Sequence, residues 1–531
     1  MVAPSTSWSS TSHAHHRAHG VVGHPVGADA DAEEEAADAE DARLLLGARA
    51  RAGGGVMDGA HDARSGSDAV QAAVDAIGWG RYQRTLFVVC GLCWCADGGL
   101  LLMMPLCLPQ LERAFHVTPL AQAVLLSLAG VGAALGAVAF GLAADRVGRR
   151  LALATCQAMG IAFSVFGCVS GTLTSLYFCQ VGLGAAVGGS IPVAFSLLTE
   201  WLPTAQRDES LVLMQVWFKT GVVMEVAMGW VLSSYGWRLV FLFAGAPALL
   251  SLVPLLLLCE ESAIFLVGAG RTRDASHALA TVARWNGKPV PSQATSLHPG
   301  SDRSGELTSS SKGTSSPSAR TPLSFDRVLS LTSALWLFAN LASGLYQWLP
   351  ELSTSAGASR AANFGSLLAA NAVGVAAFVL TAYVLVPRFG YARLLPVACG
   401  TCAAFVGAMA AAYALKSLDT LLATYVLWTF AYDVAWPVIY ASAPLLFSPD
   451  VRSSSFGIAS AVGKVGIVLS PWTRVAVNSF GSKPLLLMTL VFMVFWGVTT
   501  LVASALHPYL ARIKATRHQD GDATAVPAAE H

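Results

Sequence analysis

Long apolar runs alternate with short polar turns over most of this 531-residue chain. An apolar run of about 18 or more residues is long enough to cross the hydrocarbon core of a bilayer as an α-helix. We predict twelve such spans, at residues 85–107, 121–143, 151–170, 174–198, 210–233, 238–258, 331–349, 364–386, 394–413, 420–445, 455–475 and 485–506. The pattern therefore predicts an all-α polytopic membrane protein.

A polar segment at residues 261–328 separates the spans into two groups of six. This predicts two pseudo-symmetric six-helix halves, at 79–260 and 329–508. Six plus six is the arrangement of transporters whose halves rock around a site near the bilayer midplane. Within the polar segment, "RTRDASHALATVARWNG" has helical periodicity, and "SSSKGTSSPSARTP" predicts a flexible linker.

Both ends of the chain are polar. Residues 1–78 lack a long apolar run and are predicted to be disordered, and 509–531 are predicted to form a second tail. The motif "EDARLLL" (40–46) resembles an acidic dileucine sorting signal. No signal peptide precedes the first span, which we expect to direct insertion. A group of tail histidines could bind metal, but a solvated low-complexity tract is favoured: His13, His15, His16, His19 and His24.

Lys and Arg are distributed unequally between the two sets of loops, which predicts that both termini face the cytosol. The predicted inside set is Arg81, Arg84, Arg146, Arg149, Arg150, Arg207, Arg388, Arg393, Arg452, Arg512, Lys514 and Arg517. The predicted outside set is Arg113, Arg238, Arg360, Lys416, Arg474 and Lys483. The plasma membrane and an endosomal or vesicular membrane both remain open.

The composition adds few chemical candidates. Only 12% of residues are charged and the formal net charge is +1, so nucleic acid is not an expected partner. The ten cysteines fall inside spans or at their edges and are interpreted as small buried hydrophobic residues. We expect no cofactor, no metal and no catalytic residue, and a monomer in the bilayer.

One short turn between the second and third spans is unusually polar. It reads "GLAADRVGRR" (141–150), with one acid and three arginines around two glycines. Gly141 is expected to let helices approach closely, and Gly148 to permit the tight turn. Asp145 is expected to accept hydrogen bonds from a helix N-terminus or an arginine. Three arginines hold the turn at the cytoplasmic side: Arg146, Arg149 and Arg150.

The spacing of this turn resembles the G-x-x-x-D-R-x-G-R-R signature of the major facilitator superfamily. The equivalent turn in the second half is "PRFGYAR" (387–393), in which Gly390 corresponds to Gly148 and Pro387 replaces the acid. This repetition predicts an internal duplication. We further expect Asp145 and Arg149 to stabilise the state closed to the cytosol by charge pairing across the interface of the two halves.

Longer stretches resemble the synaptic vesicle 2-related branch of that superfamily, near sugar and organic-ion porters. They include 77–111, with its Ala-Asp pair in the first span, and 181–207, which ends in "EWLPTAQR" and assigns Glu200 and Arg207 to the gating motif. The segments "YGWR", "EESA" and 450–471 are also similar. The sequence departs from the family at Gln180, where a basic residue is usual, and around "EESA", where Glu260 and Ile264 replace Pro and Arg.

Ionisable residues in the middle of spans are costly and are retained mostly where they face a cavity or a partner. Five such residues are Asp97, Lys219, Glu225, Asp433 and Lys464. Lys219 and Glu225 lie on different faces of one helix, so we do not expect them to pair with each other. For each of them, a buried ion pair with a neighbouring helix is the structural alternative to a role in transport. Asp97 is the leading candidate for a proton carrier, with Lys464 approaching and leaving it; a packing role tied to Lys464 or Lys219 is the alternative.

Aromatic residues adjoin one of these acids. Tyr432 and Trp436 lie beside Asp433, which suits a cationic or ring-shaped solute, although core packing is the commoner use of such rings. The leading functional prediction is a secondary active transporter of a small organic ion or sugar-like solute, with protons as the candidate coupling ion. The alternative is a transport-inactive relative with a trafficking or receptor role, as the loss of a base at Gln180 would allow. No ATP-binding motif or enzyme motif supports other classes.

Overall fold

A computed structural model of the protein describes residues 66–292, 325–447, 452–478 and 484–524. Regular structure within these ranges consists of helices and contains no β-strand. The histidine group, the "EDARLLL" motif and the Ser-rich linker lie outside the described residues.

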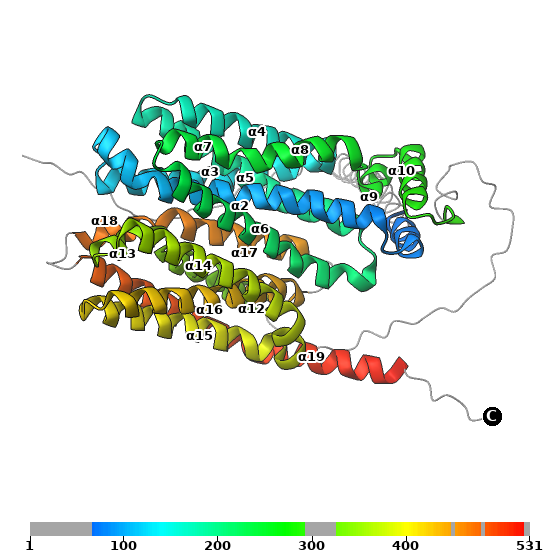
Figure 1. The fold of residues 1–531 in the computed structure, drawn as a ribbon. Helices are drawn as coiled ribbons and strands as arrows, with labels where there is room; N and C mark the ends of the chain where they lie inside the picture. The colour runs from blue at the N-terminus through cyan, green and yellow to red at the C-terminus, as the bar shows by residue number, and fades with distance from the viewer. Residues whose placement is uncertain (1–65, 293–324, 448–451, 479–483, 525–531) are drawn as a thin grey trace, which may run out of the picture. The chain divides into compact units, whose positions relative to one another are not determined.

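The helices form two groups that lie side by side, blue to green and yellow to red in Figure 1. The first group, the N-half, consists of α2 (Arg81–Phe115), α3 (Pro119–Val147), α4 (Arg149–Val169), α5 (Leu173–Trp201), α6 (Thr204–Leu232), α7 (Trp237–Ala244) and α8 (Ala246–Leu258). The second, the C-half, consists of α12 (Phe325–Ser343), α13 (Leu345–Ser355), α14 (Arg360–Leu380), the π-helical turn η1 (Thr381–Leu385), α15 (Val386–Ala414), α16 (Leu418–Leu445), α17 (Arg452–Leu469), α18 (Trp472–Asn478) and α19 (Pro484–Thr524).

The helices are long and apolar enough to cross a bilayer. Ten segments among the described residues meet this condition, or eleven when the bent pair of α17 and α18 counts as one span. One of the ten is a 55-residue stretch, Arg360–Ala414, in which the non-helical backbone of Gly390 separates two helices. With that stretch divided at Gly390, each of the twelve predicted spans has a helical counterpart.

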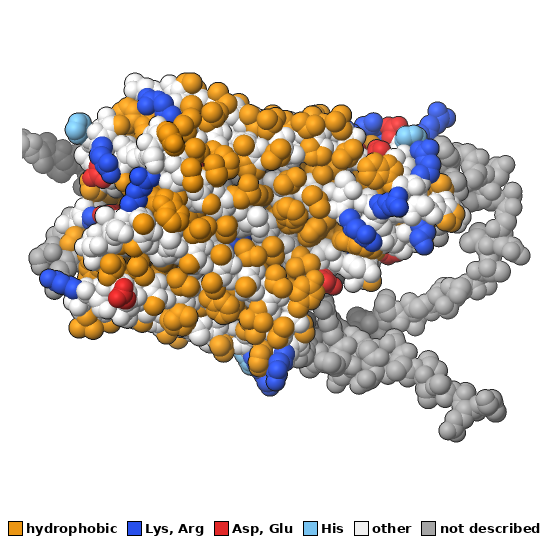
Figure 2. Space-filling model, in the orientation of Figure 1, with side chains coloured by type: hydrophobic (Ala, Val, Ile, Leu, Met, Phe, Trp, Pro, Cys, Tyr) orange, Lys and Arg blue, Asp and Glu red, His pale blue; other side chains and the backbone are white. Residues whose placement is uncertain are grey.

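The surface agrees with this assignment. On the face in Figure 2, hydrophobic side chains cover the region between the two ends of the helices, and Lys, Arg, Asp and Glu gather at those ends. A hydrophobic belt between charged ends is the distribution that a bilayer requires, because the hydrocarbon core does not solvate charge.

Close backbone approach, rather than large side chains, joins α3 to α5. A Cβ atom added at Gly132 or Gly136 of α3 would collide with a backbone oxygen of α5, and one at Gly184 or Gly188 of α5 would collide with α3. Small residues four apart let membrane helices pack in this way. The prediction that Gly141 serves this purpose is wrong, since nothing lies within 4 Å of the position its Cβ would occupy.

Additional short helices cover the end of the N-half that carries the α3–α4 turn. They are a helix at residues 66–77, α9 (Ala263–Gly268) and the predicted amphipathic helix α10 (Thr272–Trp285). Asn286 accepts a hydrogen bond of 2.9 Å from the N–H of Tyr82 at the start of α2. Because residues 66–77 form a helix, the predicted disorder of 1–78 is wrong for this segment. The predicted tail at 509–531 is helical as far as Thr524.

The two halves touch through a few pairs of helices, chiefly α3 with α17 and α6 with α14. The hydroxyl of Ser127 on α3 donates a hydrogen bond of 2.7 Å to the carbonyl of Val468 on α17. At the end of α6, the guanidinium of Arg360 donates to the carbonyl of Trp230 at 3.1 Å, and Trp230 stacks on Phe364. Both contacts lie toward the end opposite the α3–α4 turn.

Candidate functional site

A buried ion pair connects the two halves. Lys219 lies near the middle of α6, and Asp433 lies near the middle of α16. The Nζ atom of Lys219 lies 2.7 Å from Oδ2 and 3.0 Å from Oδ1 of Asp433. Their side chains are 5% and 2% exposed, so each charge depends on the other for compensation. The structure thus shows the buried ion pair with another helix that was the structural alternative for Lys219.

Helix α14 covers this ion pair at a glycine. A Cβ atom at Gly374 would collide with the carboxylate of Asp433 and would lie 2.5 Å from Cε of Lys219. The ring of Tyr346 on α13 lies on another side, with its centroid 5.6 Å from Nζ of Lys219. The hydroxyl of Tyr346 donates a hydrogen bond of 2.6 Å to the side-chain carbonyl of Asn371 on α14, which fixes the ring.

Aromatic rings continue from this pair along α16. Tyr346 and Tyr432 are nearly parallel, at 16° and 6.3 Å between centroids. Tyr432 also contacts Trp436 at 6.0 Å and Trp428 at 5.3 Å. The structure thus brings the predicted residues Lys219, Asp433, Tyr432 and Trp436 together, in one cluster at the interface of the halves.

Two further buried acids lie in the N-half, and neither makes an ion pair with a described cation. Asp97 is 2% exposed, has Ser190 as a hydrogen-bond partner, and its Oδ2 atom lacks a partner among the described residues. Ser190 in turn accepts from the Gln157 side chain at 2.8 Å. Glu225 is 1% exposed, and neither of its carboxyl oxygens has a hydrogen-bond partner among the described residues, so the ion pair with a neighbouring helix that was the alternative for Glu225 is not present there.

Other predicted site residues are not joined to these acids by a described contact. Lys464 on α17 is partly buried, and its Nζ atom donates to Ser460 on its own helix at 3.5 Å. Gln180 is buried on α5. The predicted approach of Lys464 to Asp97, and the alternative of an Asp97–Lys219 pair, are therefore not features of this structure.

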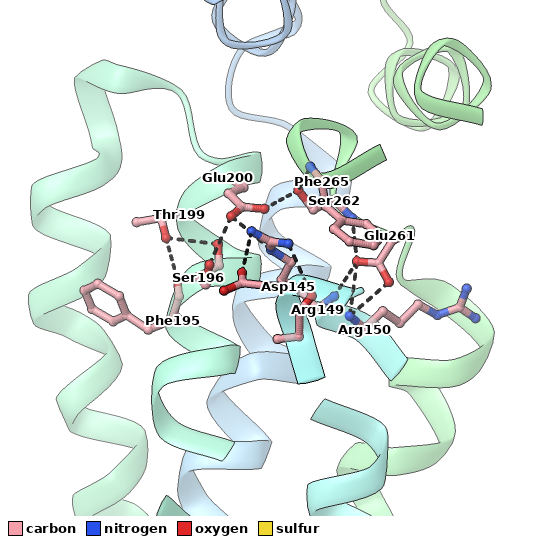
Figure 3. A network of polar contacts seen from close by, with 11 residues as sticks. Asp145, Arg149, Arg150, Phe195, Ser196, Thr199, Glu200, Glu261, Ser262 and Phe265 are labelled. Carbon is pink, nitrogen blue, oxygen red and sulfur yellow. Dashed lines mark hydrogen bonds and ion pairs between the residues drawn. The ribbon is translucent and has the colours of Figure 1, made fainter. Parts of the chain in front are cut away.

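The polar turn at 141–150 is held by a network that Figure 3 shows from close by. Gly148 adopts φ 106° and ψ 156°, a backbone conformation that is nearly restricted to glycine. Gly390, its counterpart in the C-half, has φ 72° and ψ 161°. The same conformation at both turns supports the predicted duplication.

A carboxylate that the sequence reasoning did not single out caps the helix after this turn. Glu261 accepts hydrogen bonds from the backbone N–H of Arg149 at 2.9 Å and of Arg150 at 3.2 Å (Figure 3). A carboxylate at a helix N-terminus satisfies unpaired donors and opposes the helix dipole. Of the two partners expected for Asp145, the helix N-terminus is therefore taken by Glu261, and the arginine is present: the Asp145 side chain is 71% exposed and makes an ion pair of 3.4 Å with Arg149.

The side chain of Arg149 lies at the centre of the network. Its Nε atom lies 3.3 Å from Oε1 of Glu200, and its guanidinium lies over the ring of Phe265 at 5.0 Å. The other oxygen of Glu200 accepts a hydrogen bond from Ser262. All these partners belong to the N-half or to residues 262–268, so among the described residues Arg149 makes no charge pair across the halves in this structure. The pairing of Asp145 and Arg149 across the halves in a state closed to the cytosol stays a prediction. Arg146 is exposed.

Arg207, predicted as part of the gating motif, contacts the helix at 66–77 instead. Its Nη2 atom donates to the Gln71 side chain at 2.7 Å. On the same helix, Asp75 accepts from the backbone N–H of Thr204, the first residue of α6, at 2.7 Å. Partial burial acts to raise the pKa of Asp75, but the hydrogen bonds from Thr204 and Gln71 and the charge of Arg207 outweigh it, and the pKa lies below its ordinary value.

The sequence profile of the Major Facilitator Superfamily matches residues 86–471, which are most of the chain and include both the Lys219–Asp433 ion pair and the polar turn. The chain belongs to this superfamily. Similarity to solved superfamily structures agrees with the fold: the proton:xylose symporter XylE has a TM-score of 0.63 at 16% sequence identity, covering 82% of this chain and 99% of that one. A partially occluded inward-open form of XylE from E. coli gives 0.62.

Curated members of the superfamily are similar at the sequence level. The niacin transporter NiaP of Acinetobacter baylyi is 28% identical over 401 residues, which cover 74% of this chain and 86% of that protein. The synaptic vesicle 2-related protein of Rattus norvegicus is 30% identical over 223 residues, 42% of this chain and 40% of that protein. The relatives include members of the predicted branch, and membership of the superfamily together with the apolar helices makes this chain an integral membrane protein.

Several residues of this major facilitator site were missed in the sequence. Glu261 and Ser262 belong to the "EESA" segment, whose similarity to the family was visible in the sequence. The sequence did not indicate which residues they contact. Tyr346, Asn371 and Gly374 carry no signal, because an aromatic residue, an amide and a glycine in apolar spans are ordinary. Only the packing of α13 and α14 on the ion pair distinguishes them.

Proposed function

We propose that this protein is a secondary active transporter that moves a small organic solute by alternating access, with protons as the coupling ion. The observation that carries the proposal is the Lys219–Asp433 ion pair, buried between the halves near the middle of both helices. An intramembrane charge pair that faces a bundle interior is costly to keep and is typical of transport pathways.

The relatives support a small organic solute. One is named for niacin and one structural neighbour for xylose with protons. The rings of Tyr346, Tyr432 and Trp436 beside the ion pair provide flat apolar surfaces for such a molecule. Transport then requires that the contacts of α3 with α17 and of α6 with α14 separate while the opposite ends of the halves approach.

Asp97 is the proposed coupling acid. A buried carboxylate that lacks full hydrogen bonding is unfavourable when ionised, so proton binding would neutralise it. Asp97 is followed in α2 by two glycines that pack on α6, the helix that carries Lys219. A movement of α6 would therefore change the surroundings of the Asp97 carboxylate. Asp97→Asn imitates the protonated form.

The test uses purified protein in proteoliposomes with radiolabelled nicotinate, xylose and tetraethylammonium, each with and without an imposed pH gradient. We expect gradient-driven accumulation of at least one solute by the parent protein. Asp97→Asn should lose accumulation and keep exchange at equal concentrations, and Glu225→Gln provides the matched comparison. If Asp97→Asn still accumulates solute against its gradient, Asp97 is a packing residue. Failure of the parent protein to move any solute favours the trafficking or receptor role.

We also propose that both termini face the cytosol, as the distribution of Lys and Arg predicts. The α3–α4 turn, with Arg149 and Arg150, then lies at the cytoplasmic ends of the N-half. Protease treatment of intact cells that express protein tagged at either end checks this: the tags should survive until the membrane is permeabilised.

A further inference from the structure

We propose that Lys219 binds a carboxylate group of the transported solute and that Asp433 occupies this position when the solute is absent. The solute class is then a small planar monocarboxylate. The inference rests on the proposed transport function, whose solute it specifies.

The charges at the site favour an anion. Both oxygens of Asp433 lie within 3.0 Å of the Lys219 ammonium, so the acid is already compensated. A cationic solute would find no free carboxylate there and would meet the ammonium instead. Of the two solute types that suit Asp433 and its aromatic neighbours, cationic or ring-shaped, the proposal takes the ring-shaped one.

Movement of the halves creates the need for a replacement. Lys219 belongs to the N-half and Asp433 to the C-half, so separation of α6 from α16 breaks the pair. A buried ammonium without a counter-ion is strongly unfavourable. A solute carboxylate presents the same pair of oxygens at the same charge and can replace Asp433 beside the lysine. The displaced, buried Asp433 then binds a proton, which the proposed proton coupling supplies, so neither Lys219 nor Asp433 is left as an uncompensated charge.

The other buried acids are poor substitutes for Asp433. Glu225 lies on the same helix as Lys219 but its carboxyl faces α2, 3.6 Å from the position a Gly99 Cβ would occupy. Asp97 has Ser190 on α5 as its hydrogen-bond partner within the N-half. Neither acid makes a described contact with the lysine.

The surroundings of the ammonium specify the rest of the solute. The Tyr346 ring lies 5.6 Å from Nζ of Lys219 and is fixed by its hydrogen bond to Asn371. Tyr432 lies nearly parallel to Tyr346, so a flat ring that carries the carboxylate can pack against aromatic faces. The backbone of Gly374 packs directly against the Asp433 carboxylate, whose position the solute carboxylate would take. Little space is left there, so the end of the solute that carries the carboxylate must be small.

The experiment measures equilibrium binding of nicotinate and benzoate to the purified full-length protein in detergent, with nicotinamide and benzamide as neutral controls of the same shape. We expect each acid to bind at least about tenfold more tightly than its amide, because a buried charge pair couples by about 1.4 kcal/mol or more. Lys219→Gln should abolish this preference. Asp433→Asn, which removes the internal competitor, should strengthen binding of the acids about tenfold or more.

Two comparisons guard against loss of folding. The double variant Lys219→Gln/Asp433→Asn replaces both charged side chains by neutral ones of similar size. It should remain folded and should bind the acids no more tightly than the amides. Lys416→Gln removes an exposed lysine at the end of α15 and should bind as the parent does. Nicotinate should also raise the thermal unfolding temperature of Asp433→Asn more than that of the parent protein.

Equal binding of acid and amide, absence of acid binding, or weaker acid binding by folded Asp433→Asn would each overturn the inference. Failure of the broader function is distinguishable from these results. Acid binding by detergent-solubilised protein without uptake in proteoliposomes contradicts transport but not the carboxylate site. Uptake of xylose or tetraethylammonium without acid binding contradicts the carboxylate site alone.

Discussion

Lys219 of α6 and Asp433 of α16 form a 2.7 Å ion pair across the two halves of the molecule, and Gly374 of α14 packs directly against it. The pair is therefore a contact between the halves. Whenever the interface opens, the Lys219 ammonium and the Asp433 carboxylate each need another compensating group. Its consequences for stability differ from those of the other ion pairs in the structure.

Removing one partner of this pair should be far more costly than removing both. Lys219→Gln or Asp433→Asn leaves a buried charge uncompensated, and we expect each to lower the free energy of unfolding by about 3 kcal/mol or more. The double variant should recover most of that loss. Thermal and denaturant unfolding in detergent, arranged as a double-mutant cycle, measures the coupling.

The partly exposed pair of Glu351 and Arg474 provides the control for this cycle. Its N–O distance is 2.8 Å, but the side chain of Glu351 is 38% exposed. Glu351→Gln should cost about 1 kcal/mol or less, since solvent screens the charges. Equal costs for the two pairs would contradict the importance of burial at Lys219.

The two glycines of the polar turn should respond oppositely to alanine. Gly148 has φ 106°, and an added Cβ would collide with the Glu261 carboxylate, so Gly148→Ala should destabilise the protein by about 1–3 kcal/mol. Gly141 is helical with open space around its Cβ position, so Gly141→Ala should be neutral or stabilise by up to about 1 kcal/mol. The unfolding temperatures of the two variants, measured under the same conditions, test this prediction. Equal unfolding temperatures would contradict it.

The contact between Asp75 and the start of α6 should depend on pH. The folded state lowers the pKa of Asp75 below its ordinary value of 3.8. The unfolded chain therefore binds the proton more strongly, and the stabilisation is present above that ordinary value and is lost as the pH falls through the folded pKa. Asp75→Ala should cost about 1 kcal/mol at pH 7, as for a lost helix cap, and less near pH 3. A cost independent of pH would show that the charge of Asp75 contributes nothing.

Arg360 should hold the halves together at the end opposite the polar turn. Its guanidinium donates to the Trp230 carbonyl and to the hydroxyls of Ser233 and Ser234, all across the interface. Arg360→Ala should raise the population with this end open by about fivefold or more. Spin labels at Tyr235 and Leu415, 75% and 79% exposed, report the separation of the halves.

Arg238 provides the matched control, because it donates to the Ser170 carbonyl within the N-half. Arg238→Ala should leave the distance distribution unchanged. The native cysteines interfere little with labelling, since all are buried except Cys168, which is partly exposed. A distribution that is the same in Arg360→Ala and the parent protein would mean that other contacts keep this end closed.

The sequence was sufficient for features that repeat along the chain. The length and apolarity of the spans predict helices, because a bilayer leaves the backbone no other way to satisfy its hydrogen bonds within a segment. The equivalence of Gly148 and Gly390 was readable for a similar reason: a turn that requires a backbone conformation open only to glycine keeps its glycine in both halves. The five mid-span charges were also visible, since each contrasts with an apolar background.

The partners of those charges were decided by the tertiary structure. Lys219 and Asp433 are 214 residues apart, and no periodicity relates them. Asp145 and Glu261 are both acids near the same helix start, and packing of the segment before α9 gives the capping position to Glu261. Gly141 fits the motif but contacts nothing, whereas Gly374 fits no motif and contacts both ions. A sequence records which groups must be compensated; which group compensates them depends on distances that arise only when helices pack.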